Sequence, residues 1–357
     1  MDDGSGIQRE QNLQYRLRQV EFGLNNKSMF RTVVSWMLFF TAFACTALAQ
    51  NENQQDDQNV PTFKANVNVV NLFFNVKDKH GTLIPNMIKE DFQVFEDGKQ
   101  QTIKYFNANT DLPLTLGLLI DTSGSQTRVL PMEQETGAAF LSEVLQKKDL
   151  AFVINFDLEA ELIQDFTNSP HELRVALNKV KINAPPCGGA PGLGGGPLPS
   201  NCRGGTVLYD AIYLAAEEKL RNEVGRKAMI ILTDGEDEGS RLKIRDAIEA
   251  AQKADAIVYV LLIADRGFYG GMAYNGTGAL KKVAEETGGR MIEVGNNDKK
   301  LRAAFDQIQA EMRSQYNIGY TPTNNVLDGS FRKLELKTKE GYKIQTRAGY
   351  YAQKPKN

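Results

Sequence analysis

Apolar and polar residues follow one pattern near both ends of the chain and another pattern in its middle. From 63 to 106, and again from 316 to 351, the chain is rich in β-branched and aromatic residues that are interrupted by turn signals. Such segments are typical of β-strands, and the first contains a hairpin signal at 96–98. Neither flank alone has enough strands to bury a core. We therefore expect 62–110 and 314–352 to form one discontinuous β-sandwich.

The second flank alternates between apolar and polar positions with a period of two, which is the period of a half-buried strand. Its expected strands are 316–322, 331–338 and 342–351.

The middle of the chain, 112–313, alternates between short apolar runs and segments with helical periodicity. The expected strands are 114–120, 149–156, 161–166, 227–233, 256–263 and 290–294. The expected helices are 128–145, 170–180, 206–224, 242–254, 277–287 and 298–313. Strands separated by helices imply right-handed crossovers and a doubly wound, mostly parallel sheet. The expected fold class is therefore α/β, with this domain inserted into the β-sandwich.

A targeting signal precedes these domains. Residues 32–49 carry no charge, follow Arg31, and end in the small-x-small pattern Ala47-Leu48-Ala49. This pattern predicts a secretory signal peptide within 1–49 that is cleaved before Gln50. A retained membrane anchor is the alternative, and it is the one case in which we expect contact with a membrane.

The segment 1–28 is polar and precedes a complete signal peptide, so we expect it to be a mis-assigned extension and translation to begin at Met29. The polar stretch 50–61 is expected to be a flexible spacer. The signal predicts a protein that is secreted, periplasmic or on the cell surface.

Composition excludes several classes of function. The 357 residues include 42 Lys and Arg against 44 Asp and Glu, a net charge of −2, which argues against a dedicated nucleic-acid binder. The chain has two histidines, His80 and His171, which argues against histidine-based catalysis and against a His-rich zinc site. No HExxH, CxxC or GxSxG motif is present.

Polar residues stand where two expected strands end. The strand 114–120 runs into Asp121, Ser123 and Ser125, the strand 227–233 runs into Asp234, and Thr206 opens a helix after two glycines. Ligands bind at the carboxyl ends of strands in such sheets, so we expect these residues to converge. Two carboxylates and three hydroxyls are hard oxygen ligands that suit Mg²⁺, alternatively Mn²⁺ or Ca²⁺, rather than zinc.

These five residues resemble the metal-ion-dependent adhesion site (MIDAS) of von Willebrand factor type A (VWA) domains, whose pattern is Asp-x-Ser-x-Ser, a distant Thr, and an Asp after a later strand. The resemblance covers about 112–313. The flanking strings VFEDGKQQTIKYF, YNIGYTPTN, LDGSFRKLELKTK and RAGYYA look like the secreted bacterial group called VWFA-related acidobacterial proteins. The resemblance implies a metal-dependent binding module that is generally not an enzyme. Its partner would be a protein or glycan that offers a carboxylate to the metal.

Two other interpretations stay open. A metal-assisted hydrolase would need a general base near the metal, and the carboxylates in place are the expected ligands and the cluster 236–238. A structural envelope protein with a silent metal site is the other alternative.

The segment 182–205 is rich in glycine and proline and leads directly to Thr206. Its cysteines, Cys187 and Cys202, are expected to form a disulfide in an oxidising compartment. The segment is either a stapled surface insertion or a specificity loop beside the metal.

Overall fold

The computed structural model describes residues 69–108, 112–183, 205–235, 237–264 and 277–354, all of which fall in one compact unit that spans 66–357. The expected signal peptide and spacer, 1–61, lie outside the described residues, and so do Cys187 and Cys202. Among the helices of the described ranges, none combines the length and the apolar character that a membrane span requires.

A six-stranded sheet forms the centre of the α/β part, with the strand order β10-β9-β8-β5-β6-β7. Neighbouring strands run parallel except for β7, which is antiparallel to β6. The predicted α/β class with a mostly parallel sheet is therefore confirmed. The strands are β5 (Leu114–Asp121), β6 (Leu150–Phe156), β7 (Ala160–Thr167), β8 (Arg226–Thr233), β9 (Ala256–Leu262) and β10 (Met291–Glu293).

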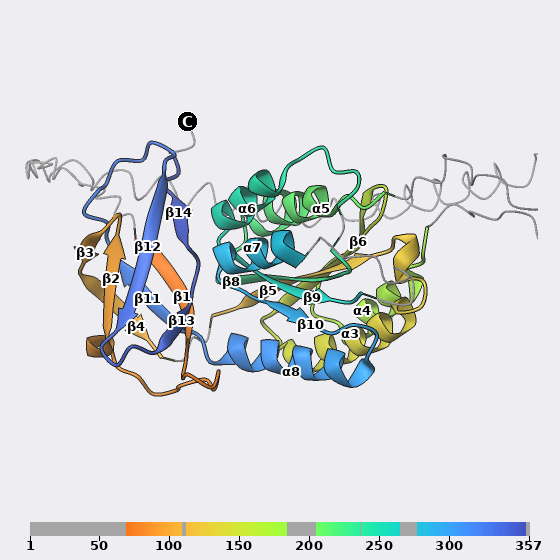
Figure 1. Cartoon of the computed structure of the whole chain (residues 1–357), viewed down its shortest axis with the longest axis horizontal. Coiled ribbons are helices and arrows are strands. Elements are labelled where there is room, and N and C mark those ends of the chain that lie inside the picture. The colour runs from red at the N-terminus through yellow and green to blue at the C-terminus, as the bar shows by residue number, and fades with distance from the viewer. Residues whose placement is uncertain (1–68, 109–111, 184–204, 236, 265–276, 355–357) are drawn as a thin grey trace, which may run out of the picture. The chain divides into compact units, whose positions relative to one another are not determined.

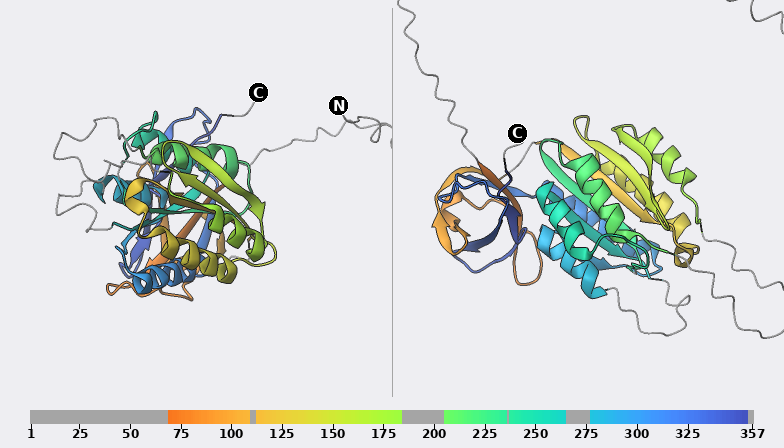
Figure 2. Two further views of the ribbon diagram at one scale, coloured as in Figure 1. Left: turned by 90° about the vertical axis from the view of Figure 1, so that its right-hand side faces the viewer. Right: turned by 90° about the horizontal axis from the view of Figure 1, so that it is seen from above.

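Helices cover both faces of this sheet (Figures 1 and 2). One face carries α3 (Leu130–Val144), α4 (Pro170–Lys179) and α8 (Asp298–Arg313). The other carries α5 (Leu208–Leu214) with its π-helical continuation η3 (Ala215–Leu220), α6 (Ile244–Lys253) and α7 (Thr277–Thr287). All residues of β5 are buried, and Ile120 packs in the core under α3 while Leu119 packs in the core under α5. A strand covered on both faces reads as a continuous apolar run, as β5 does.

Thr206 lies two residues before α5 rather than inside the helix that the sequence predicts from 206. The backbone of its segment bonds to neighbouring loops instead: the Val207 N–H donates to the Asp157 carbonyl at 2.8 Å, and the Glu238 N–H donates to the Thr206 carbonyl at 3.1 Å. These bonds hold Thr206 in a loop at the edge of the sheet.

Two four-stranded sheets make up the β-sandwich. Each combines strands that precede the α/β part in the sequence with strands that follow it. Their orders are β13-β1-β11-β4 and β14-β12-β2-β3. The strands are β1 (Val70–Lys77), β2 (Phe92–Glu96), β3 (Lys99–Gln101), β4 (Ile103–Asn107), β11 (Tyr316–Tyr320), β12 (Phe331–Thr338), β13 (Lys343–Gln345) and β14 (Gly349–Tyr351), and a short 3₁₀ turn, η1 (Lys89–Asp91), precedes β2. The predicted hairpin is present between β2 and β3, where Asp97 and Gly98 have positive φ angles. The single strand predicted over 342–351 is wrong, because β13 and β14 belong to different sheets.

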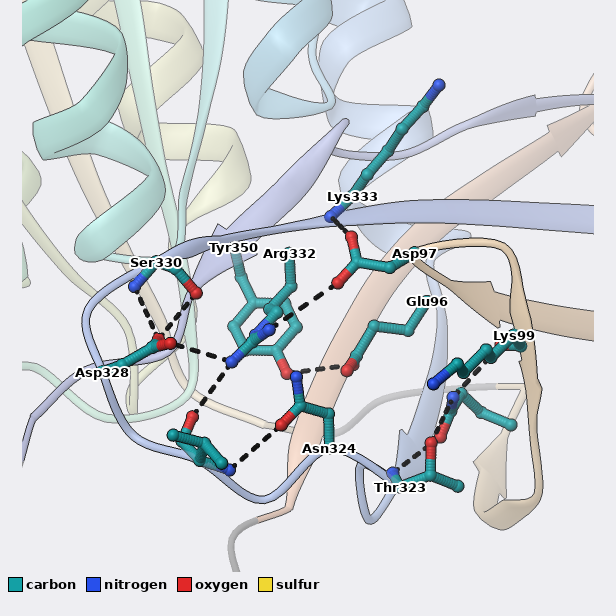
Figure 3. A network of polar contacts seen from close by, with 12 residues as sticks. Glu96, Asp97, Lys99, Thr323, Asn324, Asp328, Ser330, Arg332, Lys333 and Tyr350 are labelled. Carbon is teal, nitrogen blue, oxygen red and sulfur yellow. Dashed lines mark hydrogen bonds and ion pairs between the residues drawn. The ribbon is translucent and has the colours of Figure 1, made fainter.

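A polar network extends from the interior of the sandwich to its surface (Figure 3). Glu96 is 1% exposed and accepts hydrogen bonds from the hydroxyls of Tyr320 at 2.7 Å and Tyr350 at 2.9 Å. Arg332 lies between the carboxylates of Asp97 and Asp328. Burial, strengthened by the Glu96 carboxylate, raises the pKa of both tyrosines. The hydroxyls therefore stay protonated and donate to Glu96.

A second buried network joins the sandwich to α8. Glu311 of α8 accepts from Lys77 of β1 at 2.8 Å and from Gln345 of β13 at 3.1 Å. Arg290, which precedes β10, also contacts Glu311, at 2.6 Å. One buried carboxylate thus connects two sandwich strands with a helix of the α/β part.

Candidate metal centre

The two predicted aspartates lie at the carboxyl ends of adjacent strands. Asp121 is the last residue of β5, and Asp234 directly follows β8. The parallel register pairs Ile120 with Leu232, so Asp121 lies beside Thr233. The Thr233 hydroxyl donates a 2.6 Å hydrogen bond to Oδ2 of Asp121. The pairing of β5 with β8 therefore brings both aspartates to one edge of the sheet, where they are 0% and 1% exposed.

The two serines are held on the turn that follows Asp121. The Ser123 N–H donates to Oδ1 of Asp121 at 2.9 Å, and the hydroxyls of Ser123 and Ser125 are 3.0 Å apart. The short 3₁₀ turn η2 (Gly124–Gln126) closes the loop, with a bond from the Gln126 N–H to the Ser123 carbonyl. The alternating Asp-x-Ser-x-Ser spacing thus gathers its three polar side chains within one turn.

Thr206 is placed beside these loops through its backbone. Its carbonyl is bonded to the segment that follows Asp234, and the adjacent Val207 N–H is bonded to Asp157, which follows β6. The carboxylate of Asp157 also accepts from the hydroxyl of Thr122, at 2.8 Å. Asp157 therefore ties the Thr206 segment to the loop of Asp121.

Asp157 and Thr233 are two further residues of the site that do not belong to the predicted ligand set. Both stand at the carboxyl ends of strands, which is the same feature that pointed to Asp121 and Asp234. Neither residue belongs to the motif of alternating oxygen ligands, so the motif by itself does not reveal them. In the structure both act by orienting the loops and the carboxylate of the predicted site.

Burial and the neighbouring Asp234 carboxylate raise the pKa of Asp121 to about 7, although hydrogen bonds from Ser123 and Thr233 oppose the shift. An ionised carboxylate is costly in a buried place unless it is paired or coordinates a metal. The donor set of carboxylates and hydroxyls fits a hard divalent cation. Within the described ranges, no three or more His, Cys, Asp or Glu side chains are arranged to hold a metal. The predicted site differs from such a group because it combines two carboxylates with three hydroxyls.

A third buried acid near the site, Glu133 on α3, is not part of the motif either. It is 0% exposed, and the charges of Asp121 and Asp234 both act on it. The sequence contains a sign of this burial, because Glu133 lies on the apolar stripe that runs from Leu130 to Phe140 of the predicted helix.

No protein-family model matches the sequence, and no curated protein matches it. Among solved structures, the conserved hypothetical protein BatB from Bacteroides thetaiotaomicron is 20% identical with a TM-score of 0.42, and the match covers 56% of this chain and 100% of BatB. Proximal thread matrix protein 1 from the mussel byssus, with a zinc-occupied MIDAS motif, is 13% identical with a TM-score of 0.44, over 61% of this chain and 50% of its own. A von Willebrand factor type A protein from Catenulispora acidiphila is 12% identical with a TM-score of 0.43, over 82% and 75%.

Proposed function

We propose that this chain is a VWA-domain protein that binds a partner through a divalent cation held by Asp121, Ser123, Ser125, Thr206 and Asp234. The observation that carries the proposal is the pairing of β5 with β8, which places two buried aspartates beside each other at the edge where the serine turn also lies. Buried carboxylates in this arrangement call for a positive charge.

The proposed cation is Mg²⁺, with Mn²⁺ or Ca²⁺ as alternatives, because every proposed donor is a hard oxygen. Bound there, it would offer a coordination position to an acidic group of the partner. The hydroxyl donors are neutral, so a carboxylate from a protein or glycan is the ligand that best matches the remaining charge. Thr233 and Ser123 orient the Asp121 carboxylate through the two hydrogen bonds described above.

Binding rather than catalysis is the proposed activity. A metal-assisted hydrolase requires a general base that reaches the substrate. Of the further carboxylates near the site, Glu133 is fully buried, and those of Asp157 and Asp237 accept hydrogen bonds from the hydroxyls of Thr122 and Ser240. Glu238 of the cluster 236–238 is exposed, and the hydrolase alternative would depend on it. The histidines lie elsewhere, His80 in the turn after β1 and His171 in the first turn of α4. The proposal includes export of the protein by the signal within 1–49, with the mature chain secreted, periplasmic or on the cell surface.

The first test measures Mg²⁺ binding by calorimetry on the full chain after treatment with EDTA. Asp121→Asn keeps the size of the side chain and removes its charge, so binding should weaken by more than the ~10–100-fold typical of residues outside the ligand set. Glu135→Gln, on the exposed side of α3, is the control and should bind as wild type does. Absence of Mg²⁺, Mn²⁺ and Ca²⁺ binding by the wild type would refute the metal site.

The second test concerns the partner. Extracellular and envelope proteins captured on the immobilised chain should be released by EDTA, rebind when Mg²⁺ is restored, and fail to bind Asp121→Asn. Capture that is equal with EDTA, and equal for the variant, would show that partner binding does not use the metal. Cleavage of captured material would favour the hydrolase alternative instead.

A further inference from the structure

Glu133 is an ionisable side chain without a partner in the interior of the α/β part. Neither of its carboxylate oxygens has a hydrogen-bond partner within the described part of the chain, and the side chain is 0% exposed. Leaving a buried polar group unsatisfied costs about 1–3 kcal/mol, and more when the group is charged. A role that uses the carboxylate is therefore needed to account for it.

Gln126 is a second buried polar side chain without a partner, and it belongs to the turn that carries the serines. It is 0% exposed, and both its amide nitrogen and its amide oxygen lack hydrogen-bond partners among the described residues. It is the last residue of η2, one position after Ser125. Two unsatisfied polar side chains thus lie on the segment that leads from the serine turn into α3.

Both aspartates of the predicted site act on Glu133 electrostatically. Burial, followed by the charges of Asp121 and Asp234, raises the pKa of Glu133 well above its usual value. Three carboxylates therefore lie within electrostatic range of one another, and each is at most 1% exposed. A divalent cation bound by Asp121 and Asp234 would offset the repulsion among the three carboxylates.

We propose that Glu133 is a positioning residue of the metal site, which with Gln126 supplies negative charge and hydrogen-bonding groups outside the direct ligands and so strengthens binding of a divalent cation. This inference rests on the proposed metal site. Groups outside the ligand set orient ligands and bound water, and their loss typically weakens metal affinity ~10–100-fold. Mg²⁺ keeps several waters when it binds to proteins, and such waters need the partners that Glu133 and Gln126 provide.

The test compares Glu133→Gln with wild type and with Glu135→Gln, a control two residues along the same helix whose side chain is 74% exposed. Mg²⁺ affinity is measured by calorimetry on the full chain, and thermal unfolding is followed with EDTA and with excess Mg²⁺. Glu133→Gln should bind Mg²⁺ ~10-fold more weakly or worse, whereas Glu135→Gln should be unchanged. With EDTA, the melting temperature of Glu133→Gln should equal or exceed that of wild type, because Gln replaces a buried acid whose ionisation burial and the two aspartates oppose.

Weaker Mg²⁺ binding together with a melting temperature that does not fall would separate this role from a purely structural one. If Glu133 has only a structural role, Glu133→Gln should have a lower melting temperature than wild type with EDTA. Its Mg²⁺ affinity should then stay within about twofold of that of wild type, instead of falling ~10-fold. This result would overturn the inference. Glu133→Met, which keeps the chain length without a polar group, is the second variant if Glu133→Gln fails to fold, with the same expected results. Unchanged binding in these variants, when wild type binds and Asp121→Asn does not, refutes only the role of Glu133. Absence of binding by wild type refutes the proposed function as well.

Discussion

The contact between α8 and the β-sandwich allows a quantitative prediction, because one buried carboxylate serves several donors. The Glu311 side chain is 3% exposed, and that of Lys77 is 10% exposed. Glu311 also contacts Arg290, whose side chain is 31% exposed, and it accepts from Gln345. Burial lowers the pKa of Lys77, and the hydrogen bond and charge of Glu311 counteract that shift.

Glu311→Leu leaves two cationic side chains without their shared carboxylate. Removing one partner of a buried ion pair typically costs 3–5 kcal/mol, so we expect the free energy of unfolding to fall by about that amount. Lys77→Met leaves Glu311 with Arg290 and Gln345, so its expected cost is smaller, about 1–3 kcal/mol. The double variant should cost less than the sum of the two, by about 0.5–3 kcal/mol, because it leaves one cation, Arg290, without the Glu311 carboxylate instead of two.

Urea unfolding of the full chain, followed by far-UV circular dichroism, measures these differences. With a slope near the upper end of the usual range, about 3 kcal/mol per M, a loss of 3–5 kcal/mol moves the midpoint by about 1–2 M. Glu335→Leu removes the exposed pair with Lys337, whose atoms are 3.1 Å apart, and serves as control. Its cost should stay below about 1 kcal/mol. Equal costs for Glu311→Leu and Lys77→Met, or additive costs in the double variant, would refute the reasoning.

Four further substitutions test other parts of the structure. Glu96→Leu removes the acceptor of two buried tyrosine hydroxyls and should lower the free energy of unfolding by about 2–4 kcal/mol in urea, whereas a cost near zero would mean that the hydroxyls find other acceptors. Gly289→Ala would place a Cβ 1.9 Å from the Val258 carbonyl oxygen and should cost more than about 2 kcal/mol. In Gly278→Ala, on α7, the added Cβ would meet no atom within 4 Å, so this variant should be neutral or stabilising by up to about 1 kcal/mol. Similar melting temperatures for the two alanine variants would contradict the close approach of Gly289 to Val258. Asp157→Ala removes the acceptor of the Thr122 hydroxyl and should weaken Mg²⁺ binding about tenfold in calorimetry by loosening the loop of Asp121, and unchanged affinity would show that this side-chain hydrogen bond is not needed.

The sequence by itself determined the order of the elements and the position of the two aspartates at strand ends. Both follow from local properties: the spacing of apolar residues distinguishes a helix from a strand, and the end of an apolar run marks the end of a strand. Parallel strands bring their carboxyl ends to one edge. Asp121 and Asp234 could therefore be placed together although 113 positions separate them, counted as 234 − 121.

Only the tertiary structure decided where charges are buried and what pairs with them. The sequence does not show that Glu311 meets Lys77, because those residues lie 234 positions apart and on different elements. It also does not show that β13 and β14 separate into two sheets, because the alternating pattern continues through the residues between them. Glu133 stands on an apolar stripe in the sequence, yet its proximity to both aspartates depends on how α3 packs against the sheet. Burial and electrostatic partners arise from segments that meet only in the folded chain, and this is why the pattern of residues alone could not supply them.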